Sequence, residues 1–431
     1  MKRRFFFVSA MCIMALTSCS KSVTVKDPIT VQSPAPTEQI TKVSLSDTQK
    51  GYVSAGNAMA FRFLKQLYSG ENLVCSPLSL QYALAMTANG AQGETLQEIT
   101  DFLGYGSDGI DALNQYSRIL LEQLPAVDLD VTLKVTDALL VNNKFPLQPS
   151  FKKTVEDYYY AAIDNMDFAD AAQIAARIND WASRSTNGFI DKVMEPSDIS
   201  AQAAAFLMNA LYFKAKWAGS EYAPMFLEYA TRDENFTMDD GSVKQVKMMN
   251  NTRRHRYAEM DGYKVLALPY AGGKFFMYIL LPDKNNLQGL LDKLQATSWD
   301  SILKSLKQDA DVYLKLPKFD IENKFNLNES LQALGVKRAF MEGSAQFDRM
   351  FDKPGYYFWI GNVIQKARIS VAEWGTEAAA VTVVQMEAGS DGPDTGEEPK
   401  RVNFYADHPF AFAIGEATSG TILFEGIYTG K

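Results

Sequence analysis

Hydrophobic residues recur every three or four positions in several segments of the first half of the chain. This spacing predicts helices over residues 55–68, 78–89 and 174–184. The second of these follows Ser76-Pro77, and proline fits the first turn of a helix.

Later segments carry short runs of β-branched, aromatic and other apolar residues, which are typical of strands. These runs are residues 204–213, 263–269, 275–281, 311–316, 358–363, 367–371, 402–405, 410–415 and 421–428. Helices are concentrated early and strands late, without regular alternation. The pattern therefore predicts an α+β fold with large, mostly antiparallel sheets.

The N-terminus has the pattern of an export signal. Basic residues at 2–4 precede an apolar run over 5–16, which is too short to span a bilayer as a mature helix. Residues 16–19 (Leu-Thr-Ser-Cys) then resemble the lipobox of bacterial lipoproteins, in which the chain is cut before Cys19 and the thiol is acylated. The alternative is an ordinary signal peptide with a chance cysteine. Both interpretations predict that the chain is exported.

Residues 19–46 are polar and contain three prolines, so we expect a flexible tether there and a single domain over 47–431. Loss of residues 1–18 removes three basic residues and changes the net charge from −8 to −11. An acidic protein is a poor ligand for nucleic acid or anionic lipid. We therefore expect no nucleic-acid partner. We expect the protein to be attached to a bacterial membrane, at the outer membrane or the cell surface, through acyl chains on Cys19.

Candidate enzyme chemistry is sparse, and we expect no enzyme. The two histidines, His255 and His408, lie outside any HExxH, and the chain has no paired CxxC, GxxxxGK[ST] or GxSxG motif. His255 lies in a basic cluster, residues 253–256, which is expected on a solvated surface. Once Cys19 is acylated, Cys75 remains as a single thiol of the domain. It can form neither a disulfide framework nor a thiolate metal site, so it is expected to be buried and inert, with no metal or cofactor.

One segment near the C-terminus alternates in an unusual way. In residues 373–390 (EWGTEAAAVTVVQMEAGS), the even positions from 376 onward are uncharged and the first four are small, whereas the glutamates at 377 and 387 are at odd positions. Successive side chains of a strand point to opposite faces. As a central strand, this segment would turn its charge to solvent and its small residues to a packed layer. The glycine-, proline- and acid-rich residues 389–399 predict an exposed, protease-accessible loop. An edge strand with a long surface turn is the alternative.

Residues 373–380 (Glu-x-Gly-Thr-Glu-Ala-Ala-Ala) resemble the reactive-loop hinge of inhibitory serpins. Other segments resemble the same family in the same order across residues 50–431. They are residues 72–80, 83–95, 178–188, 209–217, 268–270, 281–282, 316–319, 334–340 and 407–410. The chain is identified as a member of the serpin family, of the inhibitory type and anchored as a bacterial lipoprotein. The resemblance implies helices packed on large mixed or antiparallel sheets, with an exposed reactive loop.

The resemblance also implies the activity. In this family the target protease attacks the loop and forms a covalent acyl-enzyme, and the cut hinge then inserts into the central sheet. Small uncharged residues on the inward face permit insertion, whereas relatives that have lost inhibition often carry charge or proline there. We therefore expect a monomeric suicide-substrate inhibitor, with a non-inhibitory serpin-like binding protein as the alternative. A lipid-anchored hydrolase is disfavoured by the shortage of histidine.

Site residues follow from the resemblance. The hinge is assigned to Glu373, Gly375, Thr376, Glu377, Ala378, Ala379, Ala380, Val381 and Thr382. The residues that control opening of the sheet are Ser76, Ser79, Asn209 and Gln365, which the family calls the shutter, and Trp217, part of the breach. Gln365 stands where the family has histidine. Its amide can still donate and accept, so a network is expected without the pH response of a histidine.

Counting seventeen residues from Glu373, as the family spacing implies, places the scissile bond between Gly389 and Ser390. The loop that follows is longer than usual, so Met386, Glu387 and Ala388 are neighbouring candidates. Residues 369–399 contain no arginine or lysine, which disfavours trypsin-like targets. Elastase-like or subtilisin-like serine proteases are expected, with papain-like cysteine proteases as a further class.

Overall fold

The computed structural model describes residues 28–200, 202–220, 223–376 and 400–431. The helices are α1 (Asp47–Leu67), α2 (Pro77–Gly90), α3 (Gly93–Leu103), α4 (Gly109–Gln123), α5 (Pro149–Tyr159), α6 (Ala171–Ser185), α7 (Leu287–Ala296), α8 (Trp299–Ser305) and α9 (Asn328–Ala333). The strands are β1 (Leu73–Cys75), β2 (Thr132–Asn142), β3 (Ala162–Met166), β4 (Ala205–Lys216), β5 (Arg232–Thr237), β6 (Val243–Met260), β7 (Tyr263–Pro269), β8 (Phe275–Pro282), β9 (Lys307–Pro317), β10 (Phe319–Asn326), β11 (Ile364–Ala372), β12 (Gly375–Thr376), β13 (Lys400–Tyr405), β14 (Phe410–Glu416) and β15 (Ile422–Tyr428).

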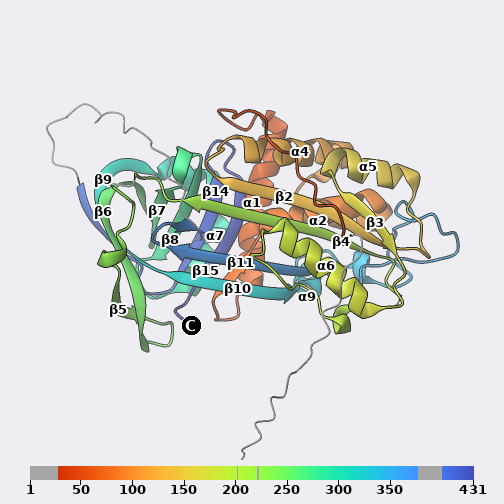
Figure 1. Ribbon diagram of the computed structural model, residues 1–431. Helices are drawn as coiled ribbons and strands as arrows, with labels where there is room; N and C mark the ends of the chain where they lie inside the picture. The colour runs from red at the N-terminus through yellow and green to blue at the C-terminus, as the bar shows by residue number, and fades with distance from the viewer. Residues whose placement is uncertain (1–27, 201, 221–222, 377–399) are drawn as a thin grey trace, which may run out of the picture.

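Two sheets organise these strands (Figure 1). The first, here called the central sheet, has the order β10-β11-β12-β4-β2-β3. The second has nine strands, in the order β1-β15-β14-β8-β7-β6-β9-β13, with β5 paired to β6. Most neighbours are antiparallel, but β2 with β3 and β9 with β13 are parallel. The predicted α+β class with large mixed sheets is confirmed.

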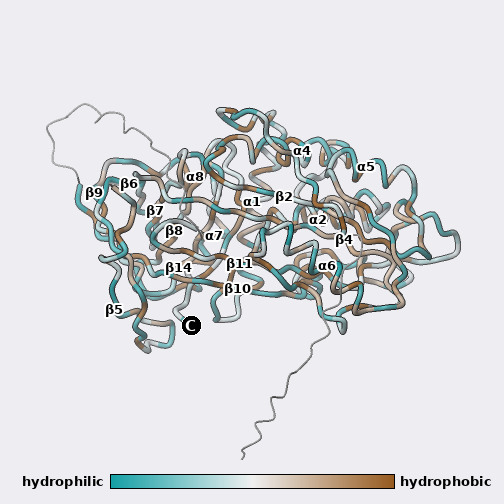
Figure 2. Tube along the Cα trace, in the orientation of Figure 1, coloured by the Kyte–Doolittle hydropathy of each residue, from teal (hydrophilic) through white to brown (hydrophobic). Residues whose placement is uncertain are grey.

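Helix α2 is almost entirely buried, and it packs against β4 of the central sheet. Ser76 caps its N-terminus by accepting a hydrogen bond from the backbone N–H of Ser79, and Pro77 occupies the first turn. Twelve of its fourteen residues are buried, so it has no polar face. Figure 2 shows hydrophobic positions concentrated in the interior, where helices meet the sheets, with hydrophilic positions along outer loops.

The structure agrees with most of the predicted elements and differs at one. The run 263–269 is strand β7, residue for residue. In contrast, residues 358–363 are irregular, and the strand prediction there is wrong. The ring of Phe358 instead lies 4.3 Å from that of Phe351 and 5.5 Å from that of Phe145. The apolar character of this run serves side-chain clustering rather than a ladder of backbone hydrogen bonds.

The described part of the expected tether, residues 28–46, lies against the domain rather than free of it. Ile29 and Val43 are buried, at 2% and 5% exposure. The Arg184 guanidinium donates to the Ile29 carbonyl at 2.6 Å, and the Ile40 N–H donates to the Ala126 carbonyl at 2.9 Å. A few apolar residues in this polar segment are therefore sufficient to hold it against the domain.

A second difference concerns His255, which is 4% exposed instead of solvated. It lies on β6, and burial, together with the nearby Arg253 charge, lowers its pKa to about 4. Alternation along the strand turns His255 to the face opposite Arg254 and Arg256, both of which are exposed. Among the helices of the described residues, none combines the length and hydrophobicity that crossing a membrane requires.

Candidate functional site: the central opening

The first two residues after the Glu373-Trp374 turn already lie inside the central sheet. Gly375 and Thr376 form β12, which pairs with β11 on one side and β4 on the other, both antiparallel. Thr376 is 3% exposed, and its hydroxyl lies 2.5 Å from the hydroxyl of Tyr270. It therefore faces the core, the face that the alternation assigns to even positions.

Gly375 is required by its position. Its backbone φ is +145°, and a β-carbon built there would lie 2.1 Å from the carbonyl oxygen of Ala215 on β4. Any side chain would push the segment away from β4. Glycine at this point lets the chain turn from β11 directly into the sheet.

Trp217 holds the upper end of β4 to the end of β11. Its indole N–H donates to the carbonyl of Ala372 at 2.8 Å, and its ring stacks on Tyr270 with centroids 4.6 Å apart. Its backbone N–H donates to the carbonyl of Trp374 at 3.2 Å. The Trp374 side chain itself is 56% exposed, so it contributes its backbone rather than its ring.

Glu373 is anchored as a buried carboxylate, with 4% exposure. Lys318 donates to one oxygen at 2.9 Å, and the hydroxyl of Thr231 donates to the other at 2.8 Å. Burial on its own would raise the pKa of Glu373, but the hydrogen bonds from Lys318, its own backbone N–H and Thr231 outweigh it and leave the pKa below its usual value. Glu373 is thus tied to the residues that immediately precede β5 and β10.

Below Thr376, no described strand lies between β4 and β11. The two strands instead line a cavity of about 690 Å³, here called the central opening. Its inner wall includes Ser76 and Ser79, its outer wall includes Ile178 and Trp181 of α6, and its lower end includes Gln202 and Phe358. Strand edges that lack a partner, such as these two, can accept an additional strand.

Gln365 of β11 binds the backbone of Ser76 at two points. Its amide nitrogen donates to the Ser76 carbonyl at 2.8 Å, and its amide oxygen accepts from the Ser76 N–H at 3.1 Å. The Ser76 hydroxyl in turn donates to the carbonyl of Leu423 at 2.8 Å. Glutamine therefore ties β11 to the start of α2 with a group that does not titrate.

The other side of the opening is tied to α2 through Asn209 of β4. The Ser79 hydroxyl donates to the side-chain oxygen of Asn209, whose amide nitrogen donates to Asp137 of β2 at 2.8 Å. Asp137 is 1% exposed, and its second carboxyl oxygen has no hydrogen-bond partner. Burial raises the pKa of Asp137 to about 7, although the Asn209 hydrogen bond opposes the shift.

The sequence analysis did not identify Asp137 as a site residue, although its position in the sequence indicates that it is buried. It is a lone acid inside the run Leu-Lys-Val-Thr-Asp-Ala-Leu-Leu-Val, residues 133–141, where a strand buried on both faces leaves an acid no route to solvent. Strand β2 as a whole was missed as well.

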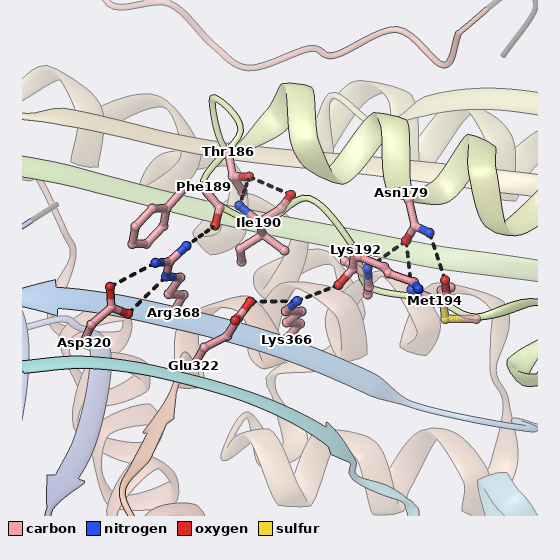
Figure 3. Close-up of polar contacts among 11 residues, drawn as sticks. Asn179, Thr186, Phe189, Ile190, Lys192, Met194, Asp320, Glu322, Lys366 and Arg368 are labelled. Carbon is pink, nitrogen blue, oxygen red and sulfur yellow. Dashed lines mark hydrogen bonds and ion pairs between the residues drawn. The ribbon is translucent and has the colours of Figure 1, made fainter. Parts of the chain in front are cut away.

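A segment over residues 186–194, here called the strap, follows α6 and covers the outer face of the opening (Figure 3). Asn179 of α6 holds its far end, because its amide oxygen accepts from the backbone N–H groups of Val193 and Met194 at 2.7 and 2.8 Å. The Thr186 hydroxyl accepts from the Ile190 N–H at 3.0 Å. Asn179 and Thr186, which belong to the family-like segment 178–188, thus hold the two ends of the strap in place.

Two basic residues of β11 bind the strap to the opposite side of the opening (Figure 3). Lys366 donates to the carbonyl of Lys192 at 2.7 Å, and the Arg368 guanidinium lies 4.7 Å from the centre of the Phe189 ring. Arg368 also forms a two-point ion pair with Asp320 of β10, at 3.1 and 2.9 Å. An inserting strand would have to pass beneath the strap.

Several predicted site residues lie outside the described residues. They are Glu377, Ala378, Ala379, Ala380, Val381 and Thr382 of the hinge, Met386, Glu387, Ala388, Gly389 and Ser390 around the scissile bond, and Cys19. Their assignments remain predictions.

The side chains of His408 and Cys75 have structural contacts. His408 is held between the Asp407 carboxylate at 2.9 Å and the Pro282 carbonyl at 2.8 Å. Burial opposes protonation, but these two acceptors raise its pKa overall. Cys75 is fully buried beside Glu425, and burial raises the pKa of its thiol well above the usual value, so the prediction of a buried thiol is confirmed.

Comparisons with known proteins agree with this architecture. The family model described as "Serpin (serine protease inhibitor)" matches residues 54–429. A serpin-like protein of Thermococcus kodakarensis is 34% identical over 380 residues, covering 88% of this chain and 85% of its own. Neuroserpin of Rattus norvegicus is 31% identical, covering 85% and 88%. Among solved structures, the thermophilic serpin tengpin in its native state has a TM-score of 0.77 at 27% identity, with 92% of this chain and 98% of tengpin covered.

Proposed function

This chain belongs to the serpin family, whose members are in general protease inhibitors rather than catalytic enzymes, and we propose that it is a suicide-substrate inhibitor of elastase-like or subtilisin-like serine proteases. The protease would attack the segment from Gly375 to about Ser390, and the cut hinge would then insert into the central opening. Papain-like cysteine proteases are a further class of target.

The single observation that carries this proposal is that the hinge enters the sheet at its upper end and the opening continues below it. Gly375 and Thr376 pair with strands on both sides. Beneath them β4 and β11 line the opening, with their edges not joined by any described strand. Strand addition therefore already has a two-residue start with a fixed register.

That register can be extended down the opening. Thr376 lies opposite Ala215 of β4 and Val371 of β11, and each further hinge residue steps one position back along both strands. Thr382 would then lie between Asn209 and Gln365. Gly389 would reach Gln202 and Phe358, which line the lower end of the opening. Because β11 begins at Ile364 and β4 at Ala205, this register has a strand on both sides as far as position 383 and β4 alone as far as position 386.

The free energy gained when the hinge inserts explains why a kinetic barrier must separate the uncut protein from the inserted state. Residues 377–386 would add ten residues opposite β4, the first seven of them also opposite β11. At about 1 kcal/mol for each net hydrogen bond, together with burial of small apolar side chains, the gain is on the order of 10 kcal/mol before ordering costs. That is comparable with the whole stability of many domains. The uncut protein is therefore held in a kinetically trapped state.

The bait sequence supports the choice of target. The proposed scissile bond follows Gly389, and the neighbours at 386–388 are Met, Glu and Ala. A trypsin-like protease needs a cation at this position, whereas elastase-like and subtilisin-like enzymes accept small or aliphatic residues. We also propose that the inhibitor acts as a monomer, exported and anchored through a lipid on Cys19 at the outer membrane or cell surface.

Incubation with elastase, subtilisin, papain and trypsin tests the proposal. We expect SDS-resistant complexes with the first two, together with release of a C-terminal peptide that begins at Ser390 or within a few residues of it, as measured by mass spectrometry. Cleavage only after Lys400 or Arg401 would contradict the bait assignment. Cleavage by every enzyme without any covalent complex would favour the alternative, a non-inhibitory serpin-like binding protein.

Membrane anchoring is tested separately. We expect radiolabelled fatty acid to be incorporated into the full chain and to be lost in Cys19→Ala, with the variant released into the soluble fraction. Equal partition of both proteins into membranes would overturn the lipidation assignment, and the inhibitory proposal would be unaffected.

A further inference from the structure

We propose that Asp137 acts as a proton switch for the central opening, such that the protonated carboxyl favours the closed sheet and the carboxylate favours separation of β4 from β11. This inference rests on the proposed insertion mechanism and concerns the regulation of that same site. It follows from the geometry of a buried acid that is connected, by side-chain hydrogen bonds, to both edges of the opening.

The connection joins five residues through four successive links. Asp137 accepts from Asn209, Asn209 accepts from Ser79, and the Ser79 N–H donates to the Ser76 hydroxyl. Gln365 of β11 completes the path by binding the Ser76 backbone. Because Asn209 lies on one edge of the opening and Gln365 on the other, this chain of contacts must break when the strands part. Its strength therefore affects how easily the sheet opens.

The surroundings of Asp137 favour its neutral form. Tyr82 from α2 and Tyr159 from α5 interact with it electrostatically, and both stay neutral because burial raises their pKa values above the ordinary range. Asn209 faces it from β4 and carries no charge. Among the described residues, no lysine, arginine or histidine contributes to the pKa of Asp137. The hydroxyl of Tyr82, like the second oxygen of Asp137, has no partner.

The direction of the effect follows from burial. In the closed sheet the pKa of Asp137 is raised to about 7, against about 4 for an exposed aspartate. Opening admits water to Asn209 and the carboxyl behind it, which lowers the pKa towards its ordinary value. The closed state thus holds the proton more tightly. Opening should become easier as the pH rises towards about 7, with little further change above it.

The proposed role of Asp137 changes the prediction made from Gln365. Replacement of the family's histidine by glutamine predicts a side-chain network whose stability does not depend on pH. Asp137 places a titratable group in the same network, on β2 instead of β11.

The test is hydrogen–deuterium exchange of the backbone amides of β4 and β11 in the full chain, compared with Asp137→Asn at each pH. The ratio of the two rates removes the intrinsic pH dependence of exchange. We expect the ratio of the two rates to rise steadily from acidic pH towards pH ~7, and exchange to be about threefold or more faster in the unmodified protein near pH ~8, since asparagine mimics the neutral carboxyl. A ratio of one at every pH would overturn the proposal.

Two further variants make the result specific. Burial also raises the pKa of Asp128 to about 6, but Asp128 lies before β2, outside this network. Asp128→Asn should therefore leave exchange in β4 and β11 unchanged, and an effect equal to that of Asp137→Asn would contradict the proposal. If Asp137→Asn does not fold, Ser79→Ala removes the link to α2 and should flatten the pH dependence. No protease is needed, so failure of inhibition and failure of the switch are separable outcomes.

Discussion

The upper and lower parts of the central opening are held by different kinds of contact. At the top, β12 joins β11 and β4 through backbone pairing at Gly375 and Thr376. Lower down, β11 and β4 each bind α2 through one side chain, Gln365 and Asn209 respectively. Backbone pairing can be extended residue by residue, whereas a side-chain network can only be broken or kept.

This difference assigns a role to each region. Under the proposed insertion mechanism, the upper end would provide a start for strand addition, with the register already fixed. The lower network would oppose insertion with a few hydrogen bonds worth about 1 kcal/mol each. Resistance of that size is small beside the gain from a full strand, so it would affect when the opening widens and not whether the inserted state is favoured.

The largest effect is expected at the upper end, from Thr376→Arg. The site is 3% exposed against Tyr270, and burial of an unpaired guanidinium there costs several kcal/mol. Insertion should fail, so the covalent complex with elastase should fall by more than about tenfold while cleavage continues. The control is Trp374→Arg, at an exposed neighbour, which should behave like the unmodified protein. Normal complex yield in Thr376→Arg would show that the hinge does not insert from this point.

The lower network is broken by Asn209→Ala. One oxygen of Asp137 and the Ser79 hydroxyl both lose their partner, which should cost about 2–3 kcal/mol in the free energy of unfolding. Urea denaturation measures the loss, and spontaneous loss of inhibitory activity should become faster. Asn165→Ala, at an exposed position on β3, should change stability by less than about 0.5 kcal/mol. Equal stability of the two variants would mean that the network does not hold the sheet.

Gly375→Ala tests whether the upper start depends on close backbone approach. Its β-carbon would lie 2.1 Å from the Ala215 carbonyl oxygen at a φ of +145°. Gly355→Ala has a positive φ of +86° with open space around it, so it isolates the backbone strain. We expect a loss of about 1 kcal/mol for Gly355→Ala and about 2 kcal/mol for Gly375→Ala, measured by thermal unfolding. A smaller loss at Gly375 would argue against tight pairing with β4.

The smallest effect is expected from Arg368→Gln, which removes one of the two β11 side chains that bind the strap and leaves Lys366 in place. The ion pair with Asp320 is more than a third exposed, so its contribution to stability is less than about 1 kcal/mol. The strap should nevertheless lift more easily, and complex formation with elastase should become up to about threefold faster. Arg62→Gln, at an exposed position of α1, is the control and should leave the rate unchanged. A slower rate in Arg368→Gln would indicate that the strap assists insertion.

Much of the fold could be predicted because local patterns and final packing agree. Strand β7 and helix α2 follow directly from hydrophobic spacing and a capped start. The prediction failed where an apolar run serves side-chain clustering, as at residues 358–363, and where one residue of a charged cluster turns inward, as at His255. Local pattern carries no information about which partner a side chain will meet.

The family motifs were sufficient to identify the family from the sequence alone, and the alternation of residues 373–390 predicts an insertable strand, because strand periodicity and short motifs are local properties. The depth to which the hinge enters, at two described residues, was decided by tertiary structure, since it depends on the distance between β4 and β11. The same holds for Asp137. Its carboxyl became part of the network only because β2 places it opposite Asn209, a pairing between residues 72 positions apart.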